Sequence, residues 1–351
     1  MKLEDNIGTK PLKRTANNRN QTIRKRKIWA AIACSLVLIC IGSFMFRKEL
    51  AILLFDTFIS NKVEATLDNS YKPIGSESEQ QQEQTQPADQ SLSPFSVLLL
   101  GIDQRKNEAA RSDSIIYSVM RKKDNKILLL SIPRDSKAYI VGKDFETKIN
   151  AAHAYGGAKM SVDTVENLLQ VPVNYYATIN FAGLTEIVDA LGGVELPITK
   201  DIVNRQKIHE KFIIKAGKPI YTGEEALNYV RYREDSDMNR TERQRIFLNS
   251  LMNRVLSLNQ ITKLPQLLEI AGSNFTTNMK SNFMIELAKD IFKSGQTPQI
   301  ESYMLRGSDA KVDGVYYYII DEQDLNYVKE LLQNWMNPNT DEANLMIPKS
   351  N

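Results

Sequence analysis

The stretch YVRYREDSDMNRTERQR, residues 229–245, concentrates arginine and carboxylate side chains in one short segment. Its charged members are Arg231, Arg233, Arg240, Arg243, Arg245, Glu234, Asp235, Asp237 and Glu242. Most charge runs are solvated helix faces joined by ion pairs, and this interpretation stays open for the stretch. The alternative is a site that grips a multiply charged anion, because arginine forks pair bidentately with phosphate oxygens.

Two other loops carry the same combination of arginine and aspartate, and each adjoins an expected strand. They span residues 101–114 and 131–135. Their charged residues are Asp103, Arg105, Arg111, Asp113, Arg134 and Asp135. A single Arg–Asp pair is usually a surface ion pair. Three such loops favour a common site, because α/β proteins place their sites at strand ends.

The chemistry that fits these side chains is the binding of a pyrophosphate together with Mg²⁺. Mg²⁺ prefers one or two carboxylates plus phosphate oxygens and water. His153 and His209 are the only histidines in the sequence, which gives no indication of a zinc site. The sequence contains neither a GxxxxGK[ST] loop nor a GxSxG elbow, so it indicates neither nucleotide hydrolysis nor that type of serine chemistry.

A scaffold of strands and helices must position these loops. Short apolar runs bounded by turn residues predict strands at 95–100, 114–120, 126–132 and 174–181. Helices are expected at 157–169, at 182–191 and from 239 to about 256. The last of these has an expected buried stripe of Ile246, Phe247, Leu251, Val255 and Leu256. Thr222-Gly-Glu-Glu225 matches a capping box that starts another short helix. This alternation predicts an α/β fold, a three-layer α-β-α sandwich on a central mixed sheet.

The N-terminal region predicts a membrane anchor. Residues 1–27 hold nine Lys or Arg and two acidic residues, and residues 28–46 carry no charge. A helix of that length, at about 1.5 Å per residue, spans roughly the hydrocarbon core of a bilayer. Positive charge before the span places the N-terminus in the cytoplasm and the rest of the chain outside. A cleaved signal peptide is the rival interpretation, but the span ends in bulky Phe44, Met45 and Phe46.

The rest of the chain is then divided into three parts. A juxtamembrane segment and a polar linker are expected at 47–93, an extracellular catalytic domain at 94–337 and a polar tail at 338–351. Both cysteines, Cys34 and Cys40, lie inside the predicted span, so the exported part has no disulfide.

Net charge limits the partners of the exported part. The whole chain carries +3 and residues 1–27 carry +7 (nine basic minus two acidic residues), which leaves −4 for the remainder. A domain with net negative charge is not a general polyanion binder, so any anion must meet locally concentrated arginines. The basic tail is a poor reader of nucleic acid, and no nucleic acid partner is expected.

Several motifs together resemble those of the LytR-CpsA-Psr family. They are RSDS at 111–114, SIPRD at 131–135, KIN at 148–150, YGG at 155–157, LGGV at 191–194, TGEEALNYVRYR at 222–233 and the final R-x-x-RQ at 240–244. They occur in the family's order and spacing over roughly residues 95–257. The predicted topology of a short basic cytoplasmic tail and one anchor also resembles that of the family.

The resemblance implies a phosphotransferase of the cell envelope. Such enzymes move an anionic glycopolymer, of teichoic acid or capsule type, from an undecaprenyl-pyrophosphate carrier onto peptidoglycan through a phosphodiester. By the same resemblance Asp103 and Asp113 would hold Mg²⁺, and Asp237 would act as general base, with Arg240 as its catalytic neighbour. The residues that would hold the pyrophosphate are Arg111, Arg134, Lys148, Arg231, Arg233, Arg240 and Gln244.

The sequence departs from the family pattern in the opening stretch. Many members read RxRxDPxGDxGR, whereas this chain reads RYREDSDMNR and is two residues shorter. Asp235 therefore competes with Asp237 as the base, and Arg105 is a less secure phosphate contact. If 231–233 is extended, Arg231 and Arg233 point to the same side. Arg240 and Gln244 share a helix face. Glu242, Arg243 and Arg245 are expected to be solvated or structural.

Two rival functions remain open at this point. A lipid pyrophosphatase would use the same phosphate grip, with water in place of the sugar hydroxyl. A regulator of the envelope or of transcription would not be an enzyme. Transfer or hydrolysis of a lipid-linked pyrophosphoryl glycan by the purified protein would separate these alternatives.

Overall fold

The computed structural model describes residues 57, 60–74, 93–103, 111–205, 211–232, 237–257, 264–294 and 298–349. The chain divides into Met1–Thr57 and Phe58–Asn351, and the fold described below is that of the second unit. The predicted span at 28–46 lies outside the described residues, as does most of the expected linker. Within the described ranges, no helix has the length and apolar character needed to cross a membrane.

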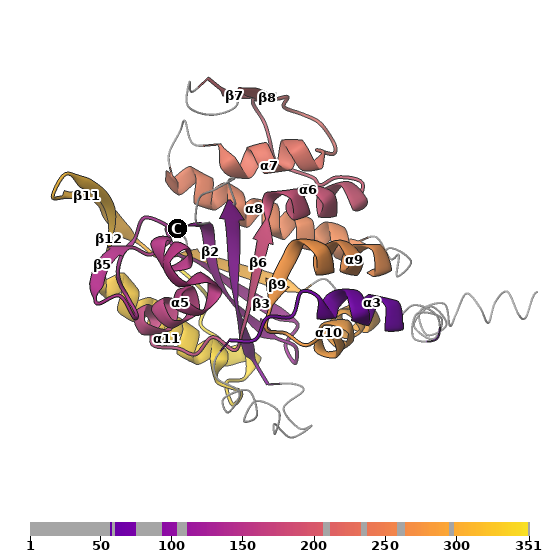
Figure 1. The fold of residues 1–351 in the computed structure, drawn as a ribbon, viewed down its shortest axis with the longest axis horizontal. Coiled ribbons are helices and arrows are strands. Elements are labelled where there is room, and N and C mark those ends of the chain that lie inside the picture. Colours follow the sequence, from indigo (N-terminus) through magenta and orange to yellow (C-terminus); the bar gives the residue numbers. More distant parts are fainter. Residues whose placement is uncertain are drawn as a thin grey trace, which may run out of the picture. The chain divides into compact units, whose positions relative to one another are not determined.

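A six-stranded mixed sheet forms the centre of this unit, in the strand order β10-β3-β2-β1-β6-β9 (Figure 1). Its strands are β1 (Phe95–Asp103), β2 (Arg111–Arg121), β3 (Lys126–Ser131), β6 (Tyr175–Asn180), β9 (Phe275–Thr277) and β10 (Gln299–Met304). β1 pairs with β6 and β3 pairs with β10 in parallel, and the other neighbours are antiparallel. The predicted α/β class with a central mixed sheet is confirmed.

All four strand predictions were correct in place, but those for β1 and β2 were too short at the functional end. β2 was expected from Ser114 and begins at Arg111. Arg111 and Asp113 therefore lie within a strand and not in a loop. β1 likewise continues to Asp103, where it pairs with Arg111. Cross-strand pairing thus extends over polar residues that carry no apolar strand signal.

Helices cover both faces of the sheet. α5 (Ala151–Leu169) and α11 (Glu322–Met336) pack on one face, where Ile115, Tyr117 and Val119 of β2 point. The intervening Ile116 points to the opposite face, which α8 (Asp237–Ser257) covers with Leu248 and Met252. Alternation along a strand explains this division, because successive side chains lie on opposite faces.

A second core joins α6 (Phe181–Ala190), α7 (Gly223–Arg231) and α8. The predicted capping box starts α7: Thr222 Oγ accepts from the Glu225 N–H, and the Glu225 carboxylate accepts from the Thr222 N–H. A Cβ on Gly223 would lie 2.3 Å from the main-chain oxygen of Thr185, so glycine lets α7 approach α6 closely. The hairpin of β7 (Ile202–Asn204) and β8 (Phe212–Ile214) lies beside these helices (Figure 1).

The long helix α8 differs from its prediction in two details. It begins at Asp237, two residues before the expected start at Asn239. Phe247 is buried as expected, but Val255 is 37% exposed. Val255 lies eight residues after Phe247, which places it about 80° around the helix from the buried face. The predicted stripe was therefore too wide at its C-terminal end.

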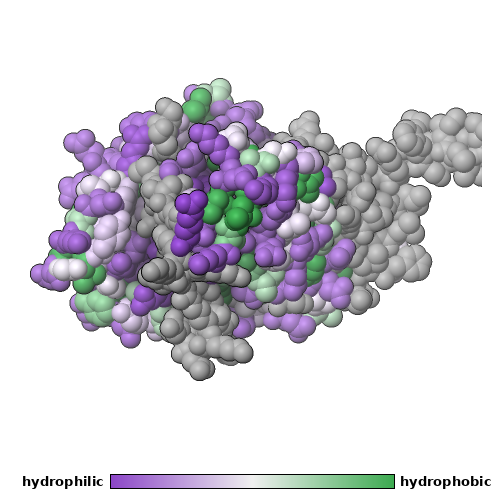
Figure 2. Space-filling view, turned by 90° about the horizontal axis from the view of Figure 1, so that it is seen from above, coloured by the Kyte–Doolittle hydropathy of each residue, from purple (hydrophilic) through white to green (hydrophobic). Residues whose placement is uncertain are grey.

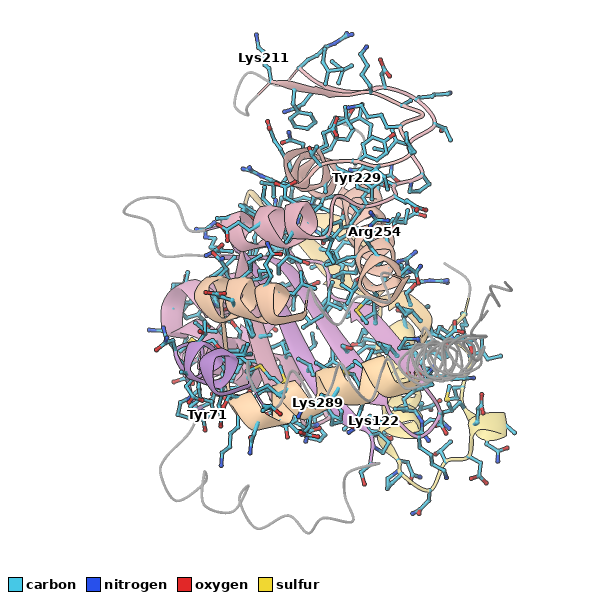
Figure 3. All side chains as sticks on the ribbon, turned by 90° about the vertical axis from the view of Figure 1, so that its right-hand side faces the viewer. Tyr71, Lys122, Lys211, Tyr229, Arg254 and Lys289 are labelled. Atoms are coloured by element: carbon cyan, nitrogen blue, oxygen red, sulfur yellow. The ribbon has the colours of Figure 1, made fainter. Side chains whose placement is uncertain are left out.

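Further helices and hairpins surround the sheet. They are α3 (Ser60–Asp68), α9 (Leu264–Asn274), α10 (Ser281–Ser294), the 3₁₀ turn Glu342–Asn344, and the hairpin strands β4 (Lys137–Ile140), β5 (Phe145–Lys148), β11 (Gly307–Val312) and β12 (Val315–Ile320). Lys122, in the turn after β2, pairs with Asp290 of α10 at 2.8 Å, and Figure 3 shows Lys122 close to Lys289 on the same helix. This ion pair fixes one end of α10 to the sheet.

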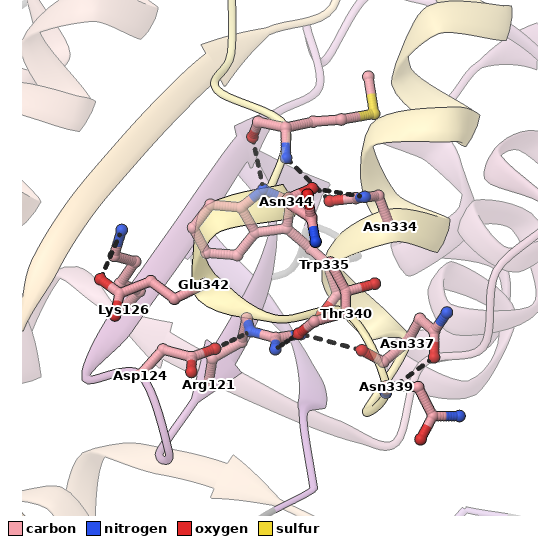
Figure 4. Close-up of polar contacts among 11 residues, drawn as sticks. Arg121, Asp124, Lys126, Asn334, Trp335, Asn337, Asn339, Thr340, Glu342 and Asn344 are labelled. Carbon is pink, nitrogen blue, oxygen red and sulfur yellow. Dashed lines mark hydrogen bonds and ion pairs between the residues drawn. The ribbon is translucent and has the colours of Figure 1, made fainter.

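Arg121, the last residue of β2, fastens the C-terminal segment to the sheet (Figure 4). It is 3% exposed and pairs with Asp124. Its guanidinium donates to three main-chain oxygens, at 2.7 Å to Trp335, 3.1 Å to Asn337 and 2.6 Å to Thr340. The indole N–H of Trp335 donates to the Met346 oxygen at 2.9 Å. The segment expected as a polar tail is therefore bound back onto the domain.

Candidate active site

A β-bulge presents Asp113 at one end of the sheet. Gly101 pairs with Ser114 and Ile102 pairs with Ser112, so Asp113 is the extra residue on β2. A Cβ on Gly101 would lie 3.1 Å from the Ser114 Cβ, which explains glycine at this tight position. Bulges redirect side chains and are common beside active sites.

The second predicted Mg²⁺ ligand, Asp103, comes from the neighbouring strand at the same end of the sheet. It is the last residue of β1, and its Cα pairs with that of Arg111. Asp113 follows Arg111 by two residues on β2. The main chain therefore brings both predicted metal ligands to one place, while the side chain of Asp103 lies outside what the structure describes.

Four charged residues form a continuous series, here termed the ion-pair chain: Asp113, Arg134, Asp135 and Lys148. Arg134 places Nη1 2.5 Å from Asp113 Oδ1 and Nε 3.2 Å from Asp135 Oδ2. Lys148 Nζ lies 2.8 Å from Asp135 Oδ1. All four side chains are largely shielded from solvent, which strengthens their mutual attraction relative to surface pairs.

Main-chain hydrogen bonds fix the positions of the segments that carry the ion-pair chain. Arg134 and Asp135 lie between β3 and β4, and the Arg134 carbonyl accepts from the Asn150 N–H at 3.2 Å. The Asp135 carbonyl accepts from the Tyr318 N–H of β12 at 2.9 Å. Lys148 ends β5 and lies 5.3 Å from the ring centroid of Tyr316. Three separate parts of the sequence thus converge on Asp135.

Asp135 was named among the charged residues of the SIPRD loop but was given no role at the predicted site. It is buried, and each of its carboxylate oxygens forms an ion pair with a predicted phosphate-binding residue, Arg134 or Lys148. Its position next to Arg134 was visible in the sequence. Its contact with Lys148 was not, because that contact depends on how the β4–β5 hairpin folds back.

On the other side of Asp113, α8 contributes Arg240 and Gln244. Arg240 is 4% exposed and donates from Nη2 to the main-chain oxygen of Asp113 at 2.7 Å. Gln244, one helical turn later, accepts from the Ser114 hydroxyl at 3.2 Å. Both residues therefore contact the bulge that carries Asp113.

Arg231 occupies a different conformation from the one expected. It is the last helical residue of α7, and the extended backbone begins only at Tyr232 (φ −60°, ψ 136°). The helix persists because the Tyr232 N–H still donates to the Asn228 carbonyl at 3.1 Å. The exposed guanidinium of Arg231 lies 4.7 Å from the ring centroid of Phe181.

The remaining predicted residues are only partly placed. Arg111 is the first residue of β2 and is exposed. Asp237 is the first residue of α8, and its side chain lies outside the description. Arg105, Arg233 and Asp235 also lie outside the described residues.

Arg243 has the structural role that was one of two expectations for it. It is 8% exposed and donates to the main-chain oxygens of Tyr229 at 3.1 Å and Tyr232 at 2.6 Å. Figure 3 shows Tyr229 on α7 and Arg254 on α8, which run close to each other. Arg243 thus fixes the end of α7, and with it Arg231, to α8.

An apolar cavity of about 310 Å³ opens beside this charged cluster. It lies between the sheet and helices α6 to α8, and its apolar lining includes Leu99, Ile116, Ile179, Leu184, Phe247 and Phe275. Its polar lining includes Asp113, Arg231, Arg240 and Gln244. Figure 2, seen from the side of β7 and β8, shows hydrophobic residues gathered in the middle of a mainly hydrophilic face. No sequence pattern indicated this cavity, because residues far apart in the chain form it.

The site places an apolar cavity beside clustered cations, an arrangement suited to an amphipathic anion. The chain matches the LytR_cpsA_psr family over residues 57–334 and belongs to that family. The family resemblance drawn from the motifs is thereby confirmed.

Two transferases show how similar this chain is in sequence to other proteins. The chain is 35% identical over 242 residues to the polyisoprenyl-teichoic acid–peptidoglycan teichoic acid transferase TagU of Bacillus subtilis (strain 168), covering 68% of this chain and 77% of the relative. It is 34% identical over 281 residues to the transferase of the same name from Enterococcus faecalis (strain ATCC 700802 / V583), covering 78% and 89%.

Solved structures show the same fold. The crystal structure of B. subtilis TagV is similar with a TM-score of 0.62 and 32% identity, covering 70% of this chain and 98% of that one. The family protein YwtF (TagT) with bound octaprenyl pyrophosphate lipid is similar with a TM-score of 0.55 and 31% identity, covering 72% and 94%.

Proposed function

We propose that this protein is a phosphotransferase that moves an anionic glycopolymer of the teichoic acid type from an undecaprenyl-pyrophosphate carrier onto peptidoglycan. The carrying observation is that the apolar cavity and the ion-pair chain meet at Asp113. A polyprenyl chain suits the cavity, and a diphosphate suits the cations at its rim. The names of the relatives describe the same transfer, and TagT has been solved with a polyprenyl pyrophosphate.

In this proposal the cations neutralise charge on the transferring phosphate. Arg134 and Lys148 approach from the ion-pair chain, and Arg231 and Arg240 approach from the helices above the cavity. Preorganised donors of this kind stabilise charge without reorganising during the reaction. Asp135 keeps Arg134 and Lys148 oriented, while Gln244 and Arg111 border the site and Arg233 completes the arginine set.

The bond changes are those of a single displacement. A sugar hydroxyl of peptidoglycan attacks the phosphorus next to the glycopolymer, and the bond to the bridging oxygen breaks, so undecaprenyl phosphate leaves. Asp237 at the start of α8 takes the hydroxyl proton. Asp235 is the competing base, because the shortened loop can change which carboxylate reaches the hydroxyl.

Mg²⁺ is the proposed cofactor, with Asp103 and Asp113 as its protein ligands. The donor set fits, because the bulge holds a carboxylate at the rim of the cavity and β1 brings a second aspartate beside it. The described residues contain no cluster of three or more metal-ligating side chains. Such a cage is not required, because Mg²⁺ commonly uses one or two carboxylates together with substrate phosphates. When bound, the ion would neutralise phosphate charge.

The domain arrangement is part of the proposal. Residues 1–27 form a cytoplasmic tail, residues 28–46 span the membrane once, and the extracellular domain that follows includes α3 and the C-terminal segment bound by Arg121, since both belong to the compact unit Phe58–Asn351. The charge pattern supports this orientation. Protease added to intact wall-less cells should release the domain, and full protection of it would contradict the orientation.

The decisive test uses the full-length protein purified in detergent. It is incubated with Mg²⁺, a lipid-linked pyrophosphoryl glycan and a peptidoglycan acceptor, and products are identified by mass spectrometry. A glycan joined to peptidoglycan through a phosphodiester supports the proposal. Release of a phosphorylated glycan without joining would show a lipid pyrophosphatase, and no reaction at all would favour a regulator.

A further inference from the structure

The hairpin of β11 and β12 reaches the ion-pair chain from outside the motifs that indicated the site. The last of those motifs ends at Gln244, whereas the hairpin begins only at Gly307. Ser136 forms an isolated parallel bridge with Tyr318, whose N–H donates to the Asp135 carbonyl at 2.9 Å. Figure 1 shows β12 beside β5. The hairpin is therefore fixed to the segment that carries the ion-pair chain.

Lys148 is held between a carboxylate and an aromatic ring. Its Nζ lies 2.8 Å from Asp135 Oδ1 and 5.3 Å from the centroid of the Tyr316 ring. The Lys148 side chain is only 26% exposed, so water screens these attractions less than at a fully exposed position. A cation within about 6 Å of an aromatic centroid is attracted electrostatically by the ring face. The carboxylate and the ring together limit the positions that the ammonium group can take.

The Tyr316 ring is itself held in place by the neighbouring strand. Its hydroxyl donates to Asp309 Oδ1 at 2.7 Å. Lys311 pairs directly with Tyr316, and Asp309 lies two residues earlier on the same face of the hairpin. The turn at Asp313 and Gly314 has positive φ angles of 51° and 78°, which suit the twist of a tight hairpin. The ring is thus oriented by the protein alone.

The ring contact meets a need that the carboxylate does not meet by itself. Asp135 also pairs with Arg134 Nε at 3.2 Å, so one carboxylate must hold two cations. Lysine has a flexible four-carbon stem, and an unrestrained ammonium group would have to be ordered during the reaction. A ring face attracts the ammonium group without requiring a particular N–H direction, so N–H donors of Lys148 remain for phosphate oxygens.

We propose that Tyr316 is a positioning residue whose ring face holds the Lys148 ammonium group in place for the diphosphate. This inference rests on the proposed transfer reaction, in which Lys148 neutralises phosphate charge. Tyr316 acts on the reaction only through Lys148. Two consequences distinguish this role from general support of the hairpin. Another aromatic ring should replace tyrosine, and loss of the ring should matter only while Lys148 is present.

The first experiment measures lipid binding without catalysis. Full-length protein in detergent is titrated with a polyprenyl pyrophosphate in the presence of Mg²⁺, and thermal unfolding is followed in parallel. Tyr316→Leu should bind about fivefold more weakly, the usual size of a partly shielded cation–π contact. Tyr316→Phe keeps the ring and loses only the hydrogen bond to Asp309, so it should bind nearly as the wild type does.

The matched control is Tyr317→Leu, because successive side chains of β12 lie on opposite faces of the hairpin. This control should bind as the wild type does. Unchanged binding in Tyr316→Leu would overturn the proposal, and so would equal weakening in Tyr316→Leu and Tyr316→Phe. Equal weakening in Tyr316→Leu and Tyr317→Leu would show general damage to the hairpin and also overturn it. Tyr316→Met provides a second ringless variant in case the leucine variant fails to fold.

The second experiment is a double-mutant cycle between Tyr316 and Lys148. Lys148→Met keeps most of the side-chain volume and removes the charge. Tyr316→Leu added to Lys148→Met should cause no further loss of lipid affinity. The same fivefold loss with and without Lys148 would mean that the ring contacts the lipid directly, and would overturn the proposal.

Transfer assays on the same proteins separate this inference from the proposed function. With acceptor in excess, Tyr316→Leu should lower kcat/KM for the lipid-linked donor and leave the acceptor KM unchanged. If the wild type transfers nothing but the binding cycle shows coupling, the positioning role stands and the proposed function fails. If transfer occurs but the cycle shows no coupling, the proposed function stands and the positioning role is overturned.

Discussion

Arg240 donates from Nη2 to the main-chain oxygen of Asp113 across 2.7 Å, so the start of α8 is bonded to the bulge in β2. The side chain of Asp113 makes a different connection, to Arg134 of the ion-pair chain. One residue therefore joins the sheet, α8 and the β3–β4 connection. Because the two connections use different atoms, mutagenesis can separate them.

Asp113→Ala should abolish most Mg²⁺-dependent transfer while the fold persists. It removes a proposed metal ligand and the partner of Arg134, but leaves the main-chain oxygen that Arg240 uses. We expect a fall in rate of about 10²–10³, the loss typical of a removed electrostatic stabiliser. Transfer rates over a Mg²⁺ titration, with thermal unfolding, measure both effects.

The matched control for Asp113 is Asp163→Ala, because Asp163 pairs with Lys159 on the surface of α5 at 2.9 Å. This variant should change neither rate nor stability noticeably. Asp103→Ala should resemble Asp113→Ala. A variant of either aspartate that retains full activity would remove that residue from the site, and an unfolded one would point to a structural role.

Arg231→Ala and Arg240→Ala should differ in their effect on stability. Each removes a charge-assisted contact to the diphosphate, which contributes roughly 1.5–3 kcal/mol to lipid binding. Arg231 is exposed, so its loss should leave the unfolding temperature unchanged, whereas buried Arg240 holds the bulge, so its loss should lower that temperature. Titration with a polyprenyl pyrophosphate and calorimetry test this.

Lysine substitution refines the result for Arg231. Arg231→Lys keeps the charge but not the planar fork, and should restore binding poorly. Full restoration would show that charge alone is sufficient. Unchanged lipid affinity in Arg231→Ala would remove that residue from the phosphate site.

Local sequence patterns predicted the elements that carry the site. Short apolar runs bounded by turn residues located β1 to β3, and the Thr222–Glu225 box located the start of α7. Each of these signals is contained within a few consecutive residues, so it can be recognised without tertiary information. The family motifs then indicated which charged residues belong together.

Contacts between distant segments were not predictable in the same way. The link from Asp135 to Lys148, the cavity behind Asp113 and the helical conformation of Arg231 each depend on tertiary packing. The same holds for Arg121, whose burial depends on the returning C-terminal segment. Such residues become identifiable only when the partner segment is in place.

Arg121→Ala should lower the free energy of unfolding by about 3–5 kcal/mol, because it leaves Asp124 and three main-chain oxygens without their partner in a buried setting. Urea unfolding measures this loss. Transfer by the folded variant should remain, since Arg121 lies at the end of β2 opposite Asp113. Lys126→Ala, which breaks an ion pair with exposed Glu342, is the control and should cost less than about 1 kcal/mol. Equal losses of unfolding free energy in the Arg121 and Lys126 variants would show that Arg121 does not fasten the C-terminal segment to the sheet.

Glu166 should make stability depend on pH. Burial raises the pKa of its carboxyl, while a hydrogen bond from the Val173 N–H at 2.7 Å opposes that rise. The folded state therefore holds this proton more tightly than the unfolded state. Its stabilising contribution is present below the unfolded pKa and is lost as pH rises through the raised value. Glu166→Gln keeps the acceptor oxygen and should gain stability relative to wild type as the pH rises above the unfolded pKa of a glutamate. Parallel urea-unfolding profiles would contradict this.

Asp237→Asn should separate chemistry from binding. It preserves shape and removes negative charge beside an anionic ligand, so a polyprenyl pyrophosphate should bind equally well or better. Transfer should nevertheless slow by about 10²–10⁴, the usual contribution of a general base. Asp237 begins α8, two residues after Asp235, so Asp235→Asn is the matched control and should be nearly neutral. If Asp235→Asn abolishes transfer and Asp237→Asn does not, the shortened loop has moved the base. If neither variant slows transfer, substrate or water accepts the proton and the stretch only grips the diphosphate.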